Sequence, residues 1–571
     1  MELTYRFGPF ELHPREYTLM RDGHPVRLTP KAFDTLRLLL ERRGELVTKD
    51  ALMAALWPDA IVEEANLSVQ IATLRKVLGT ERGREYIETV PKRGYRFVAD
   101  VVSPSDAPSA RRTVAVLPLK ILRSHPDGDF LAFGLADAVA ASLAERDELA
   151  VRSPLAMQRY GTATDLATIA TAVQAQFALT GTLSTAGDAV TVRFQLLELP
   201  EGTVRWSAAR TAKIDDLFAV QDAVADGVVA ALRGTETAHM PAAEAGRSRS
   251  SSRGGYALYL RANQLAYEAS RWSDARDLYR ASIEADPTFA PAWARLARCE
   301  RLIGKFSAFA EETDACFARA ADAFERAIAL NPDLSIAHSL YAQLLIDVGR
   351  AEEAMVRLTE QAVRRPYEAE LFAGLVHALR YCGLIDASLA AHRRAKRLDP
   401  TVPTSVHHTW WMNGQYESAL AETFGDIGYM QGLALASLGR EAEAAVALRW
   451  RERETVDTRI RPYLVSLRAL LEGDYAASLA AVDAAAALPV DAEALYYLVR
   501  TFARLGEDAR AAAGLDRVVT GGFWCHETFA RDPWLGDLRQ RADVAHTIAR
   551  AREHAVRADR LFGASGVARL F

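Results

Sequence analysis

Residues 67–78 read LSVQIATLRKVL, and residues 87–97 read IETVPKRGYRF. In the first stretch apolar residues recur at spacings of 4, 3 and 4, the pattern of a helix that buries one side: Leu67, Ile71, Leu74 and Leu78. The second stretch predicts two short strands on either side of a Pro-Lys-Arg-Gly turn. The sequence therefore predicts a helix with an exposed polar face, followed by a hairpin with a basic tip.

The residues before this helix predict four short strands and two further helices. Thr29 and Pro30 are typical of a helix start, a capping hydroxyl followed by proline at the first helical position. Thr48 is predicted to cap a second helix that stops at Trp57, and Asn66 to cap the third. The strands are predicted at residues 5–7, 10–12, 18–20 and 26–28, with a turn at 21–24. Four strands, three helices and a terminal hairpin make a winged helix-turn-helix, an α+β domain.

These two stretches and the order of the elements resemble the OmpR/PhoB-type DNA-binding domain over about the first 100 residues. The N-terminal position is similar to that in the ToxR/CadC-like branch of the family. The resemblance implies that Ser68 and Thr73 approach base edges, that Gln70 and Arg75 hold phosphates, and that the wing tip follows the minor groove. The predicted DNA contacts are Asn66, Ser68, Gln70, Thr73, Arg75, Lys76, Lys92 and Arg93.

The charge pattern agrees with local DNA binding. The whole chain has 69 Lys and Arg against 74 Asp and Glu, a net charge of −5, so a nucleic-acid site must be confined to a small part of it. Residues 65–97 hold seven basic and three acidic side chains. Lys76 is predicted either to contact DNA or to face water, and Arg82 and Arg84 to lie in a solvated turn. Serine and threonine make weak base contacts, so we expect tandem copies on DNA, with a homo-oligomer as one form of them.

The loop at residues 58–65 carries a second interaction hypothesis. In the family that the domain resembles, this loop can touch RNA polymerase. Its acidic pair, Glu63 and Glu64, is then either a partner surface or part of a solvated loop. Trp57, just before the loop, is predicted to belong to the core.

Two stretches of low hydrophobicity are predicted to be linkers that divide the chain. They are residues 103–112 and residues 234–254, the second rich in Ser, Gly, Ala and Arg. The predicted domains are a winged helix at 1–102, a middle domain at 113–233 and a long C-terminal domain at 255–571. The fold class is therefore multidomain and mainly α.

The middle domain, residues 113–233, alternates predicted strands and helices and then continues as three strands at 177–184, 189–199 and 203–211. This pattern predicts a central α/β sandwich. Four short motifs resemble the TolB-N-terminal-like domain: AVLP at 115–118, FGLAD at 133–137, LTGTL at 179–183 and DLFAVQD at 216–222. The resemblance does not imply a particular ligand.

The C-terminal domain contains a repeat. Proline recurs at 287, 332, 366 and 400, with spacings of 45, 34 and 34. Predicted turn residues follow a similar period, among them Gly349, Gly383, Gly414, Gly439, Gly473 and Gly506. A period of 34 residues with a turn in the middle is typical of tetratricopeptide repeats, so the sequence predicts an α-solenoid of helical pairs with a concave groove for a protein or peptide. The 11 extra residues near 305–315 predict an inserted loop or a lengthened helix, and residues 401–470 are predicted to be irregular.

No pattern predicts catalysis, a cofactor or a metal site. Phosphate loops, HExxH helices and GxSxG elbows do not occur in the sequence. His407-His408 and Cys525-His526 are predicted to be structural, because adjacent residues on a helix do not share a face. The four cysteines without a CxxC pair, the absence of a long apolar run and the polar N-terminus predict a cytoplasmic protein without a membrane segment.

The sequence thus predicts a bacterial transcriptional regulator. A winged helix binds a promoter in double-stranded DNA, and the middle domain and the repeat array sense a partner or ligand. The alternative hypothesis is a protein-assembly scaffold in which the winged helix binds protein instead of DNA.

Overall fold

The computed structural model of the 571-residue chain divides into two compact units, Met1–Arg112 and Thr113–Phe571. The structure describes residues 5–7, 9–14, 17–21, 24–42, 47–56, 65–81, 84–90, 93–98, 111–122, 128–144, 146, 148–152, 157, 166–186, 189–213, 217–233, 250, 252–306, 310–421, 428–455, 460–488 and 491–571. The predicted linkers and the 58–65 loop lie mostly outside these residues. Among the described helices, none is both long and apolar enough to cross a membrane.

The first unit begins with an antiparallel sheet in the order β1-β2-β3-β4, followed by three helices and a terminal hairpin. The fourth strand was predicted two residues too late, because Arg21 pairs directly with His24 and this register ends the strand at Val26. The elements are β1 (Tyr5–Phe7), β2 (Phe10–His13), β3 (Thr18–Arg21), β4 (His24–Val26), α1 (Pro30–Glu41), β5 (Val47–Thr48), α2 (Lys49–Leu56), α3 (Ala65–Leu78), β6 (Thr80–Glu81), β7 (Arg84–Glu85), β8 (Ile87–Val90) and β9 (Gly94–Phe97).

The helix starts in this unit follow the predicted capping in two of three cases. The Thr29 hydroxyl accepts from the backbone N–H of Ala32 at 3.3 Å, and the Thr48 hydroxyl accepts from Ala51 at 3.2 Å. The prediction for Asn66 was wrong. The third helix already begins at Ala65, and a residue inside the first turn has helical dihedral angles that a capping residue lacks.

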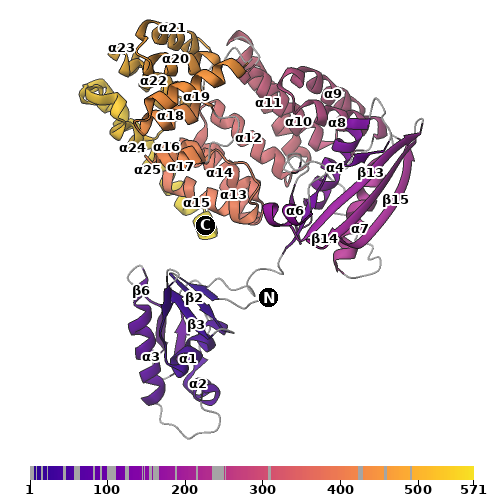
Figure 1. The fold of residues 1–571 in the computed structure, drawn as a ribbon, viewed down its shortest axis with the longest axis vertical. Helices are drawn as coiled ribbons and strands as arrows, with labels where there is room; N and C mark the ends of the chain where they lie inside the picture. The colour runs from indigo at the N-terminus through magenta and orange to yellow at the C-terminus, as the bar shows by residue number, and fades with distance from the viewer. Residues whose placement is uncertain are drawn as a thin grey trace. The chain divides into compact units, whose positions relative to one another are not determined.

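The second unit opens with a six-stranded sheet (Figure 1). The strand order is β12-β10-β13-β14-β15, β11 also pairs with β13, β10 runs parallel to β13, and β13 to β15 form an antiparallel meander. Helices α4 and α7 cover one face and α6 covers part of the other. The elements are β10 (Arg112–Val116), β11 (Lys120–Ile121), α4 (Gly128–Ala144), β12 (Leu149–Arg152), α6 (Leu166–Val173), β13 (Phe177–Ala186), β14 (Ala189–Glu198), β15 (Thr203–Lys213) and α7 (Leu217–Arg233).

The sheet and the first repeat helices share one hydrophobic core. Leu135 of α4 and Leu260 of α8 are both fully buried in the same cluster, which also includes Phe289. A second contact joins the sheet to the end of α15. There the buried Arg152 guanidinium donates to the carbonyl oxygens of Val173 and Leu398 at 2.9 and 3.1 Å. The middle segment and the array therefore pack as one compact unit.

The array consists of antiparallel helical hairpins. Six hairpin turns each contain a glycine with φ between 74° and 80°, where a side chain would be strained, and all six were predicted as turn positions: Gly349, Gly383, Gly414, Gly439, Gly473 and Gly506. The extra residues near 305–315 lengthen a helix, since α11 has 21 residues. The predicted irregular region contains the short helices α16 and α17.

The helices of the array are α8 (Arg253–Leu265), η3 (Ala269–Arg271), α9 (Trp272–Ala285), α10 (Ala290–Phe306), α11 (Ala310–Leu330), α12 (Ser335–Asp347), α13 (Ala351–Arg364), α14 (Ala369–Tyr381), α15 (Ile385–Leu398), α16 (Val406–Met412), α17 (Tyr416–Ala421), α18 (Gly428–Ser437), α19 (Glu441–Glu454), α20 (Arg461–Leu471), α21 (Tyr475–Ala486), α22 (Ala492–Arg504), α23 (Asp508–Thr520), α24 (His526–Arg531), η4 (Pro533–Gln540), α25 (Ala542–Ala564) and η5 (Val567–Leu570).

The end of the chain returns to the middle of the array. The backbone N–H of Trp524 donates to the Tyr381 carbonyl at 2.7 Å, and Arg557 of α25 pairs with Glu352 of α13 at 2.7 Å. The aromatic ring of Phe571 packs against Phe372 of α14. The solenoid is therefore folded back on itself.

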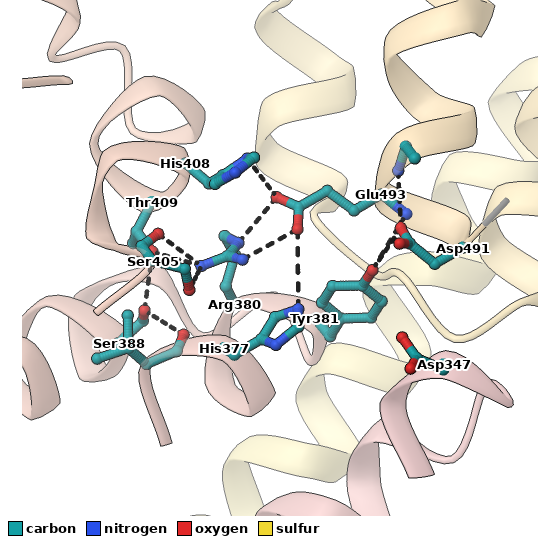
Figure 2. A network of polar contacts seen from close by, with 12 residues as sticks. Asp347, His377, Arg380, Tyr381, Ser388, Ser405, His408, Thr409, Asp491 and Glu493 are labelled. Atoms are coloured by element: carbon teal, nitrogen blue, oxygen red, sulfur yellow. Dashed lines mark hydrogen bonds and ion pairs between the residues drawn. The ribbon is translucent and has the colours of Figure 1, made fainter. Parts of the chain in front are cut away.

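A buried network of polar contacts joins helices from different hairpins of the array (Figure 2). The Arg380 guanidinium of α14 donates to both carboxylate oxygens of Glu493, at the start of α22, at 2.9 Å each. His408 of α16 lies 3.3 Å from the same carboxylate. Asp491, two residues before Glu493, pairs at 2.8 Å with Lys305 of α10. These contacts join the first helices of four hairpins, α10, α14, α16 and α22. The most distant partners in sequence, Lys305 and Asp491, are 186 residues apart.

We predict that Arg380→Met will destabilise the array strongly. Removing the arginine leaves the buried Glu493 carboxylate without its main counter-charge, at a cost of about 3–5 kcal/mol, whereas Arg380→Met combined with Glu493→Met removes both charges and costs much less. Thermal unfolding of the full chain, followed by the helical circular dichroism signal, measures both. Equal losses in the single and the double variant would contradict this role for the pair.

The same pair predicts a dependence of stability on pH. Burial raises the pKa of Glu493, but the Arg380 guanidinium, together with His408, outweighs burial and holds that pKa well below its usual range. The pair therefore contributes fully above the ordinary glutamate pKa of about 4.3, and the contribution is lost as the pH falls through the lower folded value. The difference in the free energy of unfolding between the natural chain and the Arg380→Met, Glu493→Met double variant should therefore become smaller in acid.

Candidate nucleic-acid interface

Helix α3 has one buried and one exposed side. Its apolar stripe packs in the core of the first unit and is at most 3% exposed: Leu67, Ile71, Leu74 and Leu78. The opposite side contains exposed residues, among them the predicted contacts Asn66, Ser68 and Lys76. Because the stripe fixes the rotation of the helix, each of these side chains is kept out of the core.

The other three predicted contacts on α3 are half-buried, and each has a partner within the domain. The Thr73 hydroxyl donates to the Val69 carbonyl at 2.9 Å. The Gln70 side-chain oxygen accepts from the Thr29 hydroxyl at 3.4 Å, which ties α3 to the start of α1. Their polar atoms therefore also hold the helix in place.

Arg75 connects α3 to the wing. Its guanidinium donates from Nη2 and Nε to the Ile87 carbonyl at 2.7 and 3.3 Å, and from Nη2 to the Thr89 hydroxyl at 2.8 Å. Both acceptors belong to β8, the first strand of the hairpin. The predicted phosphate ligand thus also fixes the orientation of the wing relative to α3.

The wing is anchored at its base and presents an exposed arginine at its tip. Strand β9 pairs with β5 and β8, and an added Cβ at Gly94 would lie 2.0 Å from the Val47 carbonyl oxygen, so this close pairing requires glycine. The Arg93 backbone donates to Val90 and accepts from Lys49, at 3.0 and 3.1 Å, while its side chain is exposed. Lys92, the other predicted tip contact, lies outside the described residues.

One exposed residue of α3 was missed from the sequence. Val69 is 58% exposed on the side opposite the buried stripe, between Asn66 and Thr73. An exposed aliphatic side chain on a helix that reads DNA can pack against the methyl group of thymine. The signal was present in the sequence, because Val69 lies outside the spacing that defines the apolar stripe.

The residue pairs that were predicted to be structural lie in the array. His408 donates or accepts at 2.6 Å with the Tyr497 hydroxyl, and the neighbouring His407 is buried. The Cys525 thiol lies 3.1 Å from the Arg380 carbonyl, and burial raises its pKa well above the usual value. Within the described part of the chain, no group of three or more His, Cys, Asp or Glu residues is arranged to hold a metal ion.

We predict that Arg75→Met will loosen the wing. The variant loses the hydrogen bonds to Ile87 and Thr89, worth about 1–3 kcal/mol in a partly buried setting. Hydrogen exchange of the backbone amides in residues 86–98 should become faster in the full chain. Lys76→Met, which removes the exposed neighbouring charge, is the matched control and should leave exchange unchanged. Unchanged exchange in both variants would argue that Arg75 does not hold the wing.

Comparison with known proteins places these features in a family. Residues 23–97 match the family described as "Transcriptional regulatory protein, C terminal". The chain is 38% identical over 106 residues to the transcriptional regulator HilA of Salmonella typhimurium, which is 18% of this chain and 19% of HilA. A putative adenylate cyclase of Rhizobium meliloti is 26% identical over 196 residues, 33% of this chain and 32% of that protein.

A solved structure resembles the same region. The DNA-binding domain of Escherichia coli CadC is 31% identical, over 18% of this chain and 95% of that domain, with a TM-score of 0.17. The chain thus spans about a fifth of the length of HilA, and the family match at residues 23–97 contains α3 and the wing. Residues 23–97 belong to the OmpR/PhoB-type winged-helix family of transcriptional regulatory proteins.

Proposed function

We propose that the whole chain is a sequence-specific transcriptional regulator that binds promoter DNA through α3 and the wing. The observation that carries the proposal is the position of α3, which buries its apolar stripe and presents Ser68, Val69 and Lys76 on the opposite side, beside a wing that exposes Arg93. Such a helix fits the major groove, and an adjacent basic hairpin can follow the phosphates.

Within this proposal the contacts have different tasks. Asn66, Ser68, Val69 and Thr73 face base edges, and Lys76, Lys92 and Arg93 neutralise phosphates. Gln70 and Arg75 act mainly by holding α3 against α1 and the wing, as their hydrogen bonds suggest. A regulator of chromosomal DNA acts in the cytoplasm. We assign no catalytic reaction to the chain, since its sequence carries no motif for one.

The array is proposed to bind a protein partner that controls DNA occupancy. The Arg380–Glu493 pair is buried where the helices of the array meet, so a peptide must bind outside this network or displace it. RNA polymerase remains a proposed partner for the loop at 58–65. Both proposals are separate from DNA binding itself.

We predict that the full chain will enrich a repeated motif from genomic DNA fragments. The combined variant Lys76→Ala, Lys92→Ala and Arg93→Ala should bind more weakly and show a smaller dependence of affinity on salt, by about one unit of slope for each lost phosphate contact. Binding is measured by fluorescence anisotropy over a series of salt concentrations. No enrichment at low salt, with natural and variant chains alike, would favour the scaffold alternative.

We also predict that Val69 contributes to the recognition of thymine. Val69→Ala removes two methyl groups and should weaken binding to the selected motif by about 1 kcal/mol, or roughly fivefold. Replacing the contacted thymine by uracil removes only the base methyl group and should cause a similar loss. If Val69 touches the thymine methyl group, the two changes made together should lose less binding free energy than the sum of the two separate losses. Fully additive losses at every thymine of the motif would exclude the contact.

A further inference from the structure

Strand β15 is an open edge of the sheet in the second unit. It lies at one end of the strand order, and among the described residues its one strand neighbour is β14 (Figure 1). The strand has eleven residues, of which eight are exposed and three half-buried. At the opposite end of the sheet, β12 has only four residues, and its Arg152 is buried against α15.

The chemistry of this edge favours addition of another strand. Alternate residues of an edge strand direct their backbone N–H and C=O groups outward, where they can pair with a further strand. The middle of β15 carries only short side chains, those of Ser207, Ala208 and Ala209. The strand contains no proline. The register with β14 shifts near Arg205, so the regular part of the edge is 206–213.

The two faces of this segment differ. Trp206 lies on the face covered by α7, because an added Cβ at Gly227 of α7 would lie 2.4 Å from its indole ring. Arg210 is four residues further on, so it lies on the same face. Ser207 and Ala209 are exposed on the other face, next to Gln195 and Arg193 of β14.

Symmetry limits how two copies of this edge can pair. A two-fold axis normal to the sheet keeps each face on the same side, so residues opposite each other must both be even-numbered or both odd-numbered. An axis at Arg210 would set two arginines against each other. An axis at Ala208 pairs residues 206–210 of this regular part with the same residues of the second copy, and it alone sets Arg210 opposite Trp206. A guanidinium beside an indole ring is attractive.

We propose that two copies of this chain dimerise by antiparallel pairing of β15 with β15, with Ala208 at the two-fold axis. The pairing joins the two sheets into one and covers the β15 edge of each copy, so it does not propagate into a fibre. Each exposed Ser207 then lies opposite Ala209 of the second copy. A dimer carries two winged helices, which raises the effective concentration of the second at DNA. This last consequence rests on the proposed function, whereas the pairing does not.

The test uses charge at the paired positions Ser207 and Ala209. The natural chain should show a concentration-dependent mass that approaches twice that of one chain in sedimentation equilibrium without DNA. The double variants S207E/A209E and S207K/A209K each place like charges opposite one another, so each alone should self-associate about tenfold more weakly or worse. A mixture of the two places opposite charges together and should form a mixed dimer.

Gln195→Glu is the matched control. It adds charge to the same face one strand away from the edge and should leave the mass unchanged. Thermal unfolding checks that each variant is folded. A natural chain that stays monomeric at its highest soluble concentration, or folded charge variants that dimerise separately as well as the natural chain, would overturn the proposal. If the charge variants lose cooperative DNA binding but still bind a single site, the dimer is linked to DNA binding. If the natural chain binds no DNA at all, the mass measurement still tests the dimer.

Discussion

The second unit depends on the ion pair between Arg380 and Glu493. A helical hairpin buries its apolar face only against its neighbours, so a repeat array is normally open along its length. Here two buried charges that are 113 residues apart in sequence meet at 2.9 Å and join α14 to α22. The returning C-terminal segment and the sheet, which is attached through Arg152, pack around the closed array.

The first unit follows a different constraint, since α3 must pack in the core on one side and present polar residues on the other. The apolar stripe of α3 fixes its rotation, and Arg75 fixes the wing relative to it. A side chain that the family resemblance assigns to phosphate therefore also has a structural task. In the proposed function, the side of α3 that faces the bases consists of short polar residues and Val69, which we expect to give modest affinity per domain. Two joined domains bind DNA more tightly than one, and the proposed pairing of β15 would join two copies of the chain.

Much of the fold could be predicted from the sequence because its signals are local. Capping by Thr29 and Thr48, the spacing of the stripe in α3 and the six turn glycines each depend on a few neighbouring residues. The errors were also local. The start of α3 and the position of β4 were displaced by one or two residues, since a cap or a strand end depends on the pairing of backbone groups that the residue types do not fix.

The sequence by itself determined the order of the elements, the buried side of α3 and the family of residues 23–97. Only the tertiary structure decided that Arg75 binds the wing and that Gln70 binds Thr29. It also decided the closure of the array, because Glu493 and Asp491, which pair with Arg380 and Lys305, lie more than 100 residues away from them in sequence. Periodicity specifies which face of an element is buried, but the partner of a distant charge depends on how all the elements between them pack.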